Sequence, residues 1–551
     1  MSRRHNRNTF FIATTGEIRG EVNRPATANE AERAFRFSEI VAEKSPTPSN
    51  GLLTALAEAM TRQAPDTDSH IPAGFTYLGQ FVDHDLTRDR TDILFDTPVL
   101  DPGSLMQARS PALDLDSVYG NGPTIDPHFY LADGIKLKTG STQQSPPTRA
   151  NRSLDNFDLP RNGAGAATPE EVRLALIPDN RNDENLAVAQ THLAFIRFHN
   201  NVCDRLAKQG TPSSMIFERA RELVVKHYQW MLQTDFLPRI VDPAIANDVF
   251  TNGRKVFEVE GTGFPTMPIE FSVAAYRIGH SMIREKYDWN SVFSPGGDFG
   301  DLGTLENLFR FSGTSGNLSP GADLDNPIEG SFERLPTNWI ADWTRLYDFV
   351  SDGVPELAPE TVLNFARPID VRLTDPLKDL PLGSFGARTP NATVPWQQRN
   401  LAFRNLVRAR MVGLASGQAV AAHIAAKVPD VKILTPEQIL GDDLDSLSDA
   451  QRDELTSATP LWFYVLREAS LNTVDRPGTG RLGAVGGRIV AEVFHRAIEG
   501  SRMSILRDQG FTPSLGPIPG VFRMTDLLRV AYDATKGELR PLSPSANRPA
   551  V

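Results

Sequence analysis

Apolar residues recur along much of the chain at spacings of three, four and seven, which is the pattern of amphipathic helices. The clearest stretch begins at Leu186 and continues for roughly six helical turns, and a second follows Ser214. Two more stretches cover residues 271–283 and 482–498. Alternation of the strand type is scarce, so the pattern predicts a mainly α-helical fold with few short strands.

Two segments interrupt the helical pattern. Residues 140–170 are rich in Ser, Pro, Gly and Asn, and residues 294–327 contain many glycines and few repeating apolar positions. Both lie within the region that carries the candidate chemistry. We therefore interpret them as insertions in one large domain, residues 51–551, which follows an N-terminal arm, residues 1–50.

Composition narrows the possible functions. The 551 residues, of which 40% are hydrophobic, are enough for a large core. The net charge of −11 repels nucleic acid and anionic membranes at long range, which argues against a function on either. Cys203 is the single cysteine, so a disulfide within the chain, a cysteine-based zinc site and haem attachment through two cysteines are excluded. We expect this thiol to be a buried apolar residue.

The N-terminal segment does not have the form of a standard export signal. Arg3 and Arg4 precede an apolar patch at residues 10–13, which is shorter than the roughly 7–15 residues of a signal core. No run approaches the roughly 20 apolar residues of a membrane span. We expect a protein without a membrane span that is either cytoplasmic or exported without a recognisable signal peptide.

The first candidate site is the segment FTYLGQFVDHDLT, residues 75–87. If it is helical, Gln80, Asp83 and His84 share one face, whereas Asp85 points about 100° away from His84. A neutral histidine beside an amide suits proton transfer on a small polar substrate. Taken alone, this triplet is also compatible with a surface segment or with a haem-free metal hydrolase.

A second segment offers oxygen ligands. Ser110, Ala112, Asp114 and Asp116 lie two residues apart, so an extended loop would present hydroxyl, carbonyl and carboxylate oxygens to one side. Ca²⁺ prefers six to eight such ligands. The alternative is a solvated acidic turn.

Two further segments carry charged residues or a possible metal ligand. Arg181 and Glu184 lie three residues apart at the expected start of the long helix. In the apolar segment 271–288, His280 would share a helix face with several neighbours. These neighbours are Val273, Tyr276, Arg277 and Arg284. A lone histidine on an apolar helix is more often a core residue than a ligand.

Together these segments resemble, in the same order, the motifs of the animal-type haem peroxidases of the peroxidase–cyclooxygenase superfamily. This group includes myeloperoxidase, lactoperoxidase and bacterial relatives. The matching motifs are GQFVDHDLT (79–87), the loop that ends in Val-Tyr-Gly (118–120), Arg-x-x-Glu (181–184), Tyr-Arg-Ile-Gly-His (276–280) and Asn-x-x-Arg-x-Arg (405–410). The resemblance covers residues 71–410 and implies one helical domain with haem between a distal and a proximal helix.

The resemblance assigns roles on the peroxide side of the haem. His84 would be the acid–base catalyst, Gln80 would line the peroxide and halide pocket, and Arg181 would stabilise charge as the O–O bond breaks. Asp83 and Glu184 would attach haem b through esters. Asp85 would complete a calcium site with the loop oxygens. The implied calcium ligands are Asp85, Ser110, Ala112, Asp114 and Asp116.

On the other side of the haem, the resemblance makes His280 the iron ligand, and Gly279 would let the porphyrin approach closely. Asn405 would accept the other N–H of His280, as metal-bound histidines normally require. Arg408 would pair with a haem propionate. Arg277 stands three residues before His280, as in the peroxidases.

Three departures from the family pattern affect the expectation. Asn185 stands where myeloperoxidase has a methionine bonded to haem, so no sulfonium bond can form. Asp116 replaces a serine of the mammalian enzymes and adds charge to the calcium loop. Met411 and Val412 replace an Asp-His pair, so the match weakens after Arg410.

The implied function is a haem peroxidase that reduces hydrogen peroxide through an oxyferryl intermediate and oxidises halides, thiocyanate or phenols as small reducing substrates. One alternative is a fatty-acid dioxygenase on the same scaffold, although those enzymes carry a tyrosine three residues before the proximal histidine, where this chain has Arg277. Tyr276 lies four residues before His280. A calcium-stabilised haem-binding interaction protein is another alternative, and the oligomeric state is left open.

Overall fold

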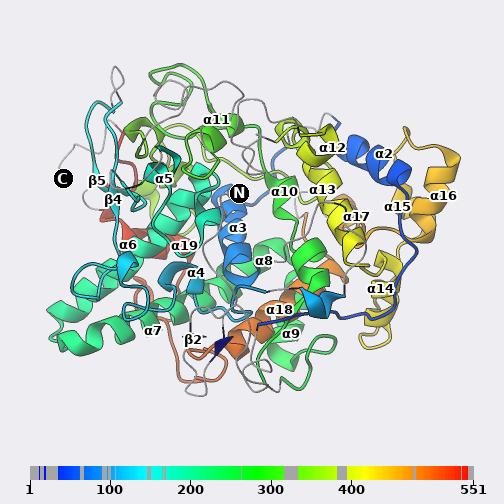
Figure 1. Cartoon of the computed structure of the whole chain (residues 1–551), viewed down its shortest axis with the longest axis horizontal. Helices are drawn as coiled ribbons and strands as arrows, with labels where there is room; N and C mark the ends of the chain where they lie inside the picture. The colour runs from blue at the N-terminus through cyan, green and yellow to red at the C-terminus, as the bar shows by residue number, and fades with distance from the viewer. Residues whose placement is uncertain are drawn as a thin grey trace.

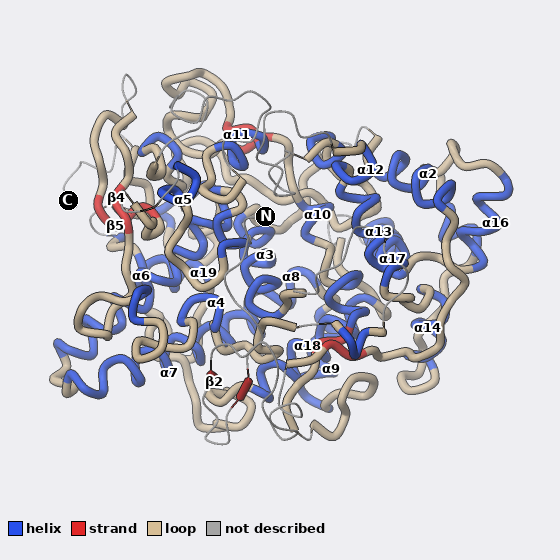
Figure 2. Tube along the Cα trace, viewed as in Figure 1, coloured by secondary structure: helices blue, strands red, loops and turns tan. Residues whose placement is uncertain are grey.

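The computed structural model describes residues 11–12, 18–19, 35–62, 67–89, 96, 101–105, 107–145, 150–163, 166, 169–261, 263–315, 333–380, 394–475, 480–534 and 537–543. Most of the expected N-terminal arm lies outside these ranges, as do residues 316–327 of the second loop segment. The described fold is mainly α-helical, as the apolar pattern predicts (Figures 1 and 2).

The α-helices differ widely in length. They are α2 (Asn50–Met60), α3 (Gly74–Leu86), α4 (Asp116–Tyr119), α5 (Pro169–Arg173), α6 (Leu186–Lys208), α7 (Ser213–Met231), α8 (Leu237–Ile240), α9 (Pro243–Asn252), α10 (Gly279–Met282), α11 (Leu305–Arg310), α12 (Trp396–Arg399), α13 (Leu401–Met411), α14 (Gly417–Ala425), α15 (Pro436–Leu440), α16 (Asp449–Ser457), α17 (Leu461–Asp475), α18 (Gly486–Gly500) and α19 (Met524–Ala531).

The strands are short and form two-stranded pairs in the described residues. The antiparallel pairs are β1 (Phe11–Ile12) with β2 (Ile18–Arg19), β4 (Gly140–Ser141) with β5 (Asp155–Asp158), and β7 (Lys286–Tyr287) with β8 (Gly303–Thr304). One parallel pair joins β3 (Phe37–Ser38) to β6 (Met267–Pro268). The segments expected to be loops therefore contain β4, β5 and the first two residues of α5 in one case and β8 and α11 in the other.

Helix α3 lies near the middle of the molecule, between α6 and the group formed by α10 and α13 (Figure 1). Phe81 of α3 stacks on Phe195 of α6, with ring centroids 4.4 Å apart. At the start of α3, a Cβ on Gly74 would lie 2.3 Å from the ring of Tyr347, so this close approach requires glycine. These contacts fix α3 in the core and so fix the positions of its polar residues.

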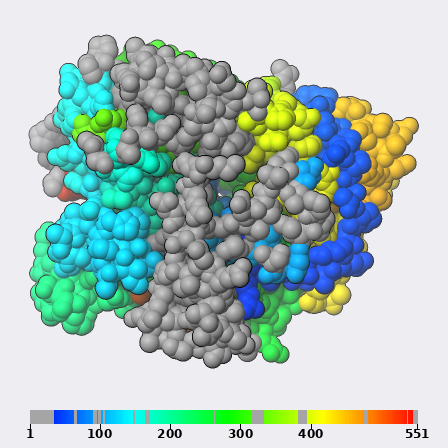
Figure 3. Space-filling model, viewed as in Figure 1, coloured from blue at the N-terminus to red at the C-terminus, as the bar shows by residue number. Residues whose placement is uncertain are grey.

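Segments far apart in the sequence meet on one side of the molecule. Helix α2 packs against α13 and α16, and Figure 3 shows the blue N-terminal part of the chain beside the yellow and orange parts. Ser49, the N-cap of α2, donates from its hydroxyl to Glu454 of α16 at 2.8 Å. These contacts join residues near 50 to the region beyond residue 420, for which the motifs gave no assignment.

The predicted helix over residues 271–283 is wrong as a continuous element. A π-helical turn covers Phe271–Ala275, a turn follows, and α10 begins only at Gly279. The backbone N–H of Tyr276 bonds to the carbonyl of Phe271, and the Arg277 guanidinium donates to the carbonyl of Ser272 at 2.8 Å. These bonds replace the regular i to i−4 pattern, so the expected shared face around His280 does not exist as one helical stripe.

The predicted helix at residues 482–498 begins later than expected, at Gly486. The Glu468 carboxylate accepts the backbone N–H groups of Val485 and Gly486 and so caps the helix from a neighbouring element. Leu482 instead bonds to the carbonyl of Ile240. The helices predicted from Leu186 and after Ser214 are confirmed as α6 and α7.

Candidate functional site

A cavity of about 480 Å³ lies between α3, the α10 segment and α13. Most of the residues that the motifs single out border this cavity. Those that border it are Gln80, Asp83, His84, Glu184, Arg277, His280, Asn405 and Arg408. The candidate distal and proximal histidines therefore border the same cavity, which their separation of almost 200 positions in the sequence does not guarantee.

His84 is held in the form that a proton acceptor needs. Its Nδ1 lies 2.8 Å from the side-chain oxygen of Asn182, so Nδ1 carries the proton and Nε2 keeps its lone pair. Burial, followed by the nearby Arg181 charge, lowers the pKa of His84 to about 4. The imidazole is therefore neutral near neutral pH. The Asn182 partner was not found from the sequence, because no motif singled it out.

Asn185 orients Gln80. The motif comparison mentions Asn185 only because it cannot form the sulfonium bond to haem. The side-chain nitrogen of Asn185 donates to Oε1 of Gln80 at 2.9 Å, and Asn185 also caps α6. Because its oxygen is occupied, Gln80 is left with its N–H donors for other contacts. Both residues border the cavity.

Arg181 lies next to His84 but not where the motif comparison expected it. It belongs to a 3₁₀ turn, Asn180–Asp183, that precedes α6, whose first residue is Leu186. Its guanidinium bonds to the Asp179 carboxylate at 2.8 Å and to the backbone carbonyl of His84 at 3.0 Å. Arg181 is not among the described residues that border the cavity, so its contact with a bound peroxide stays a prediction.

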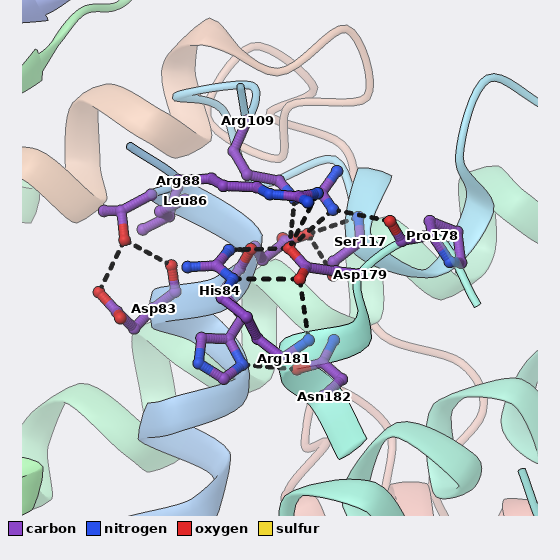
Figure 4. A network of polar contacts seen from close by, with 12 residues as sticks. Asp83, His84, Leu86, Arg88, Arg109, Ser117, Pro178, Asp179, Arg181 and Asn182 are labelled. Carbon is purple, nitrogen blue, oxygen red and sulfur yellow. Dashed lines mark hydrogen bonds and ion pairs between the residues drawn. The ribbon is translucent and has the colours of Figure 1, made fainter. Parts of the chain in front are cut away.

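A cluster of charges surrounds Asp179, as Figure 4 shows. The Arg109 guanidinium lies 2.7 Å from the Asp179 carboxylate, and that of Arg88 lies 3.9 Å away. Burial alone would raise the pKa of Asp179, but Arg109 and then Arg181 hold it well below the usual range. The carboxylate of Asp179 therefore stays negatively charged, and its bonds hold the guanidinium of Arg181 in place.

The proximal histidine also has an amide partner, Asn405. The side-chain nitrogen Nδ2 of Asn405 lies 2.8 Å from Nδ1 of His280, whereas the prediction has the oxygen of Asn405 accept the N–H of His280. An amide can present either its nitrogen or its oxygen to such an atom, and the oxygen would accept Nδ1–H and leave Nε2 free to bind a metal. Burial, followed by Arg277, lowers the pKa of His280 to about 3, so the ring is neutral.

Asp83 and Arg277 connect the two sides of the cavity. The Arg277 guanidinium lies 3.6 Å from the Asp83 carboxylate, which also accepts the Thr87 hydroxyl at 2.9 Å. Burial would raise the pKa of Asp83, but Arg277 and His84 outweigh it and lower the pKa. Asp83 is therefore a carboxylate at the edge of the cavity. Glu184 borders the same space.

The residues present fit a haem. Two neutral histidines border one cavity, and a Cβ on Gly279 would meet nothing within 4 Å, so the backbone beside His280 faces open space. Burial and the neighbouring Arg277 charge lower the pKa of the Arg408 guanidinium. Two cations that destabilise each other in this way favour an anionic ligand, which haem propionates would supply.

The candidate calcium loop is only partly as expected. Asp85 does point away from His84 into this loop, where its fully buried carboxylate accepts the Ser117 hydroxyl at 2.8 Å and the backbone N–H of Leu115 at 3.3 Å. The extended path is wrong, because Leu115 has φ of 56° and Asp116 already begins α4. Asp114 turns aside to bind the Ser501 hydroxyl.

Electrostatics nevertheless favour a cation at this loop. Burial and the neighbouring Asp116 raise the pKa of Asp85, and the buried Oδ1 of Asp116 has no hydrogen-bond partner among the residues described. Arg109 lies 3.6 Å from the other Asp116 oxygen and offsets part of the charge. Within the described ranges, no group of three or more His, Cys, Asp or Glu side chains is arranged to hold a metal. Backbone and hydroxyl oxygens, from Ala112 and Ser110, would have to supply the remaining ligands.

Cys203 is buried, and burial raises its pKa to about 12, as expected of an inert core thiol. His199, on the same helix, lies 3.1 Å from the Tyr119 hydroxyl and 2.9 Å from the carbonyl of Ile135. Both ring nitrogens of His199 therefore make hydrogen bonds in the core, which indicates a structural role for this histidine.

Comparison with known proteins gives consistent results. Residues 95–309 match the model of the animal haem peroxidase family. A peroxidase-like protein of Margaritifera margaritifera is 24% identical over 298 residues, which are 47% of this chain and 37% of that protein. Thyroid peroxidase of Homo sapiens is 25% identical over 209 residues, which are 36% of this chain and 21% of that protein. The chain therefore matches well under half the length of these relatives.

The fold is shared with solved structures of both peroxidases and oxygenases. Peroxidase A from Dictyostelium discoideum superposes with a TM-score of 0.50 at 16% identity and covers 86% of this chain and 87% of its own. The fatty acid alpha-dioxygenase of Arabidopsis thaliana gives a TM-score of 0.52 at 14% identity, with 91% and 77% covered. These are likenesses of fold.

The family match over residues 95–309 and the sequence relatives support the assignment to the peroxidase–cyclooxygenase superfamily, and the solved structures share the fold. The resemblance inferred from the motifs is thereby supported. In the described residues, no helix combines the length and the apolar character needed to cross a bilayer.

Proposed function

We propose that this protein is a haem peroxidase. The observation that carries the proposal is the single cavity bordered by His84 and His280, each neutral and each held through Nδ1 by an asparagine. Haem, when bound, would supply the redox chemistry, and His280 would be its iron ligand. Asn405 would orient His280, and Arg408 would pair with a propionate.

The remaining steps belong to residues on the distal side. Nε2 of His84 would take a proton from hydrogen peroxide and return it to the departing oxygen. The N–H donors of Gln80 would hold the peroxide or a small anion beside it, and the fixed charge of Arg181 would stabilise negative charge. Small electron donors, namely halides, thiocyanate or phenols, would complete the cycle.

Peroxide-dependent oxidation of guaiacol tests this proposal most simply. We expect the haem-loaded full chain to oxidise guaiacol with hydrogen peroxide and to take up no oxygen with linoleate. Oxygen uptake with linoleate in the absence of guaiacol turnover would reject the peroxidase in favour of a dioxygenase. A haem-loaded chain that does neither would support an interaction protein.

One observation supports the dioxygenase as a second candidate. Tyr276 borders the cavity, and its buried hydroxyl has no hydrogen-bond partner in the part of the chain that the structure describes. The adjoining wall is apolar, with Phe75, Phe236 and Ile240. The interrupted helix before His280 also places Tyr276 differently from a regular helix. If this candidate holds, Tyr276→Phe should abolish oxygen uptake with a fatty acid while the haem spectrum is retained.

The ester links are a separate prediction. Asp83 and Glu184 both border the cavity, so both carboxylates are available to a haem there. Extraction with acidified acetone should leave haem on the wild type and remove it from the double variant Asp83→Val, Glu184→Gln. Each single variant should retain haem through the other ester. Complete extraction from the wild type would refute the esters and leave the peroxidase proposal standing.

Calcium is predicted to stabilise the fold through Asp85. The buried carboxylates of Asp85 and Asp116 repel one another, and a bound cation would remove that repulsion. At a free calcium concentration 100 times its Kd, binding contributes about 2.7 kcal/mol. Thermal unfolding should therefore occur at a higher Tm in calcium than in EGTA. Asp85→Asn should remove most of the difference, and equal Tm values for the wild type in both conditions would exclude the site.

A further inference from the structure

We propose that Asn182 is a positioning residue that fixes the tautomer of His84, and that His192 in turn fixes the orientation of Asn182. The three residues come from three elements: α3, the 3₁₀ turn before α6, and α6 itself. The consequence for catalysis rests on the proposed peroxidase function, whereas the tautomer itself can be measured without it.

The three side chains form one continuous hydrogen-bonded line. Nδ1 of His84 lies 2.8 Å from Oδ1 of Asn182, and Nδ2 of Asn182 lies 2.9 Å from Nδ1 of His192. Asn182 and His192 are completely buried. Figure 4 shows the ring of His84 turned toward Asn182, next to the cluster around Asp179. Water therefore does not compete for these bonds.

The oxygen and the nitrogen of the Asn182 amide are chemically different, so the hydrogen bonds along the line can run in only one direction. The oxygen of Asn182 can only accept, so His84 must carry its proton on Nδ1 and keep the lone pair of Nε2. The nitrogen of Asn182 can only donate, so Nδ1 of His192 must be unprotonated. A flip of the amide would require both histidines to change tautomer together, and Nε2 of His84 could then no longer accept a proton.

His192 is suited to this task because it stays neutral. Burial lowers its pKa to about 3, and among the described residues its Nε2 has no hydrogen-bond partner, whereas Nδ1 bonds to Asn182. Its ring packs edge-on against Phe81, which holds it next to α3. A charged His192 would have no lone pair to offer and would turn the amide of Asn182 around.

The test compares three variants of the haem-loaded full chain. Asn182→Leu has a similar size and makes neither bond. Asn182→Asp still accepts Nδ1–H of His84 and also accepts from His192 in its other tautomer. Gln190→Leu is the control, because Gln190 is a buried amide on α6 that bonds to the carbonyl of Phe157 and the N–H of Ala341 and does not touch His84.

Cyanide affinity is the first measurement, because hydrogen cyanide must give its proton to a distal acceptor when it binds iron. We expect Asn182→Leu to weaken cyanide binding about 10- to 100-fold, the range that corresponds to one buried hydrogen bond. Asn182→Asp should recover most of the affinity, and Gln190→Leu should bind as the wild type does. Equal affinity in the wild type and Asn182→Leu would overturn the proposal.

The second measurement is the tautomer, read from ¹⁵N NMR of the selectively histidine-labelled full chain without added haem. The wild type should show His84 protonated at Nδ1, whereas Asn182→Leu should show a mixture of both tautomers. A wild-type His84 protonated at Nε2 would overturn the inference. If the protein proves not to bind haem, the proposed function fails, but this measurement still decides the role of Asn182.

Discussion

Replacing His84 by leucine should slow the reaction with hydrogen peroxide by about 10²- to 10⁴-fold, the range expected for the loss of a positioned acid–base group. His84 borders the cavity, is neutral, and keeps the lone pair of Nε2 because Asn182 accepts its other proton. The rate is measured as the change in the Soret band after rapid mixing with peroxide. Haem binding itself should persist, because His280 is unchanged.

A control for this prediction is available on a helix elsewhere in the structure. His423→Gln removes a histidine of α14 that does not border the cavity, and it should leave the peroxide rate unchanged. A His84→Leu rate within a factor of about three of the wild type would mean that another group accepts the proton. The assignment of the catalytic base would then be wrong, although haem binding could stand.

Replacing Asp179 by alanine should destabilise the protein by about 3–5 kcal/mol, the usual cost of removing one partner of a buried ion pair. The substitution leaves Arg109, which is fully buried, and the neighbouring Arg181 without their carboxylate. Urea unfolding of the ligand-free chain measures the loss. Arg181 would also lose its bonds to Asp179 and keep the one to the carbonyl of His84, so the peroxide rate should fall together with the stability.

An exposed ion pair provides the comparison. Asp508 pairs with Lys226 on the surface, and Asp508→Ala should change the stability little because solvent screens the pair. If Asp179→Ala were as stable as Asp508→Ala, the charge cluster in Figure 4 would not hold Arg181 in place as its contacts indicate.

Local periodicity predicted the parts of the site that lie on regular helices. The i, i+3 and i+4 spacing correctly placed Gln80, Asp83 and His84 toward one cavity and Asp85 toward a separate loop, because α3 is a regular helix. The same spacing failed around His280. The π-helical turn there contains the backbone bond from Tyr276 to Phe271 and the bond from the Arg277 guanidinium to Ser272, and periodicity predicts neither.

Other parts of the site depend on tertiary packing. The bond between His84 and Asn182 joins residues 98 positions apart, and the bond between Asn185 and Gln80 joins residues 105 positions apart. The motifs drew attention to Arg181 and Glu184, but the residues that bond to His84 and Gln80 lie between and beside them. Only the packing of α3 against the start of α6 reveals that Asn182 and Asn185 contact His84 and Gln80.

Binding of haem between His84 and His280 is tested most directly by an absorption spectrum. The full chain produced with added haem precursor should show a Soret band, which His280→Ala should lose or retain only weakly. His84→Leu should keep the band. A wild-type chain that shows no Soret band after haem supplementation would contradict the account.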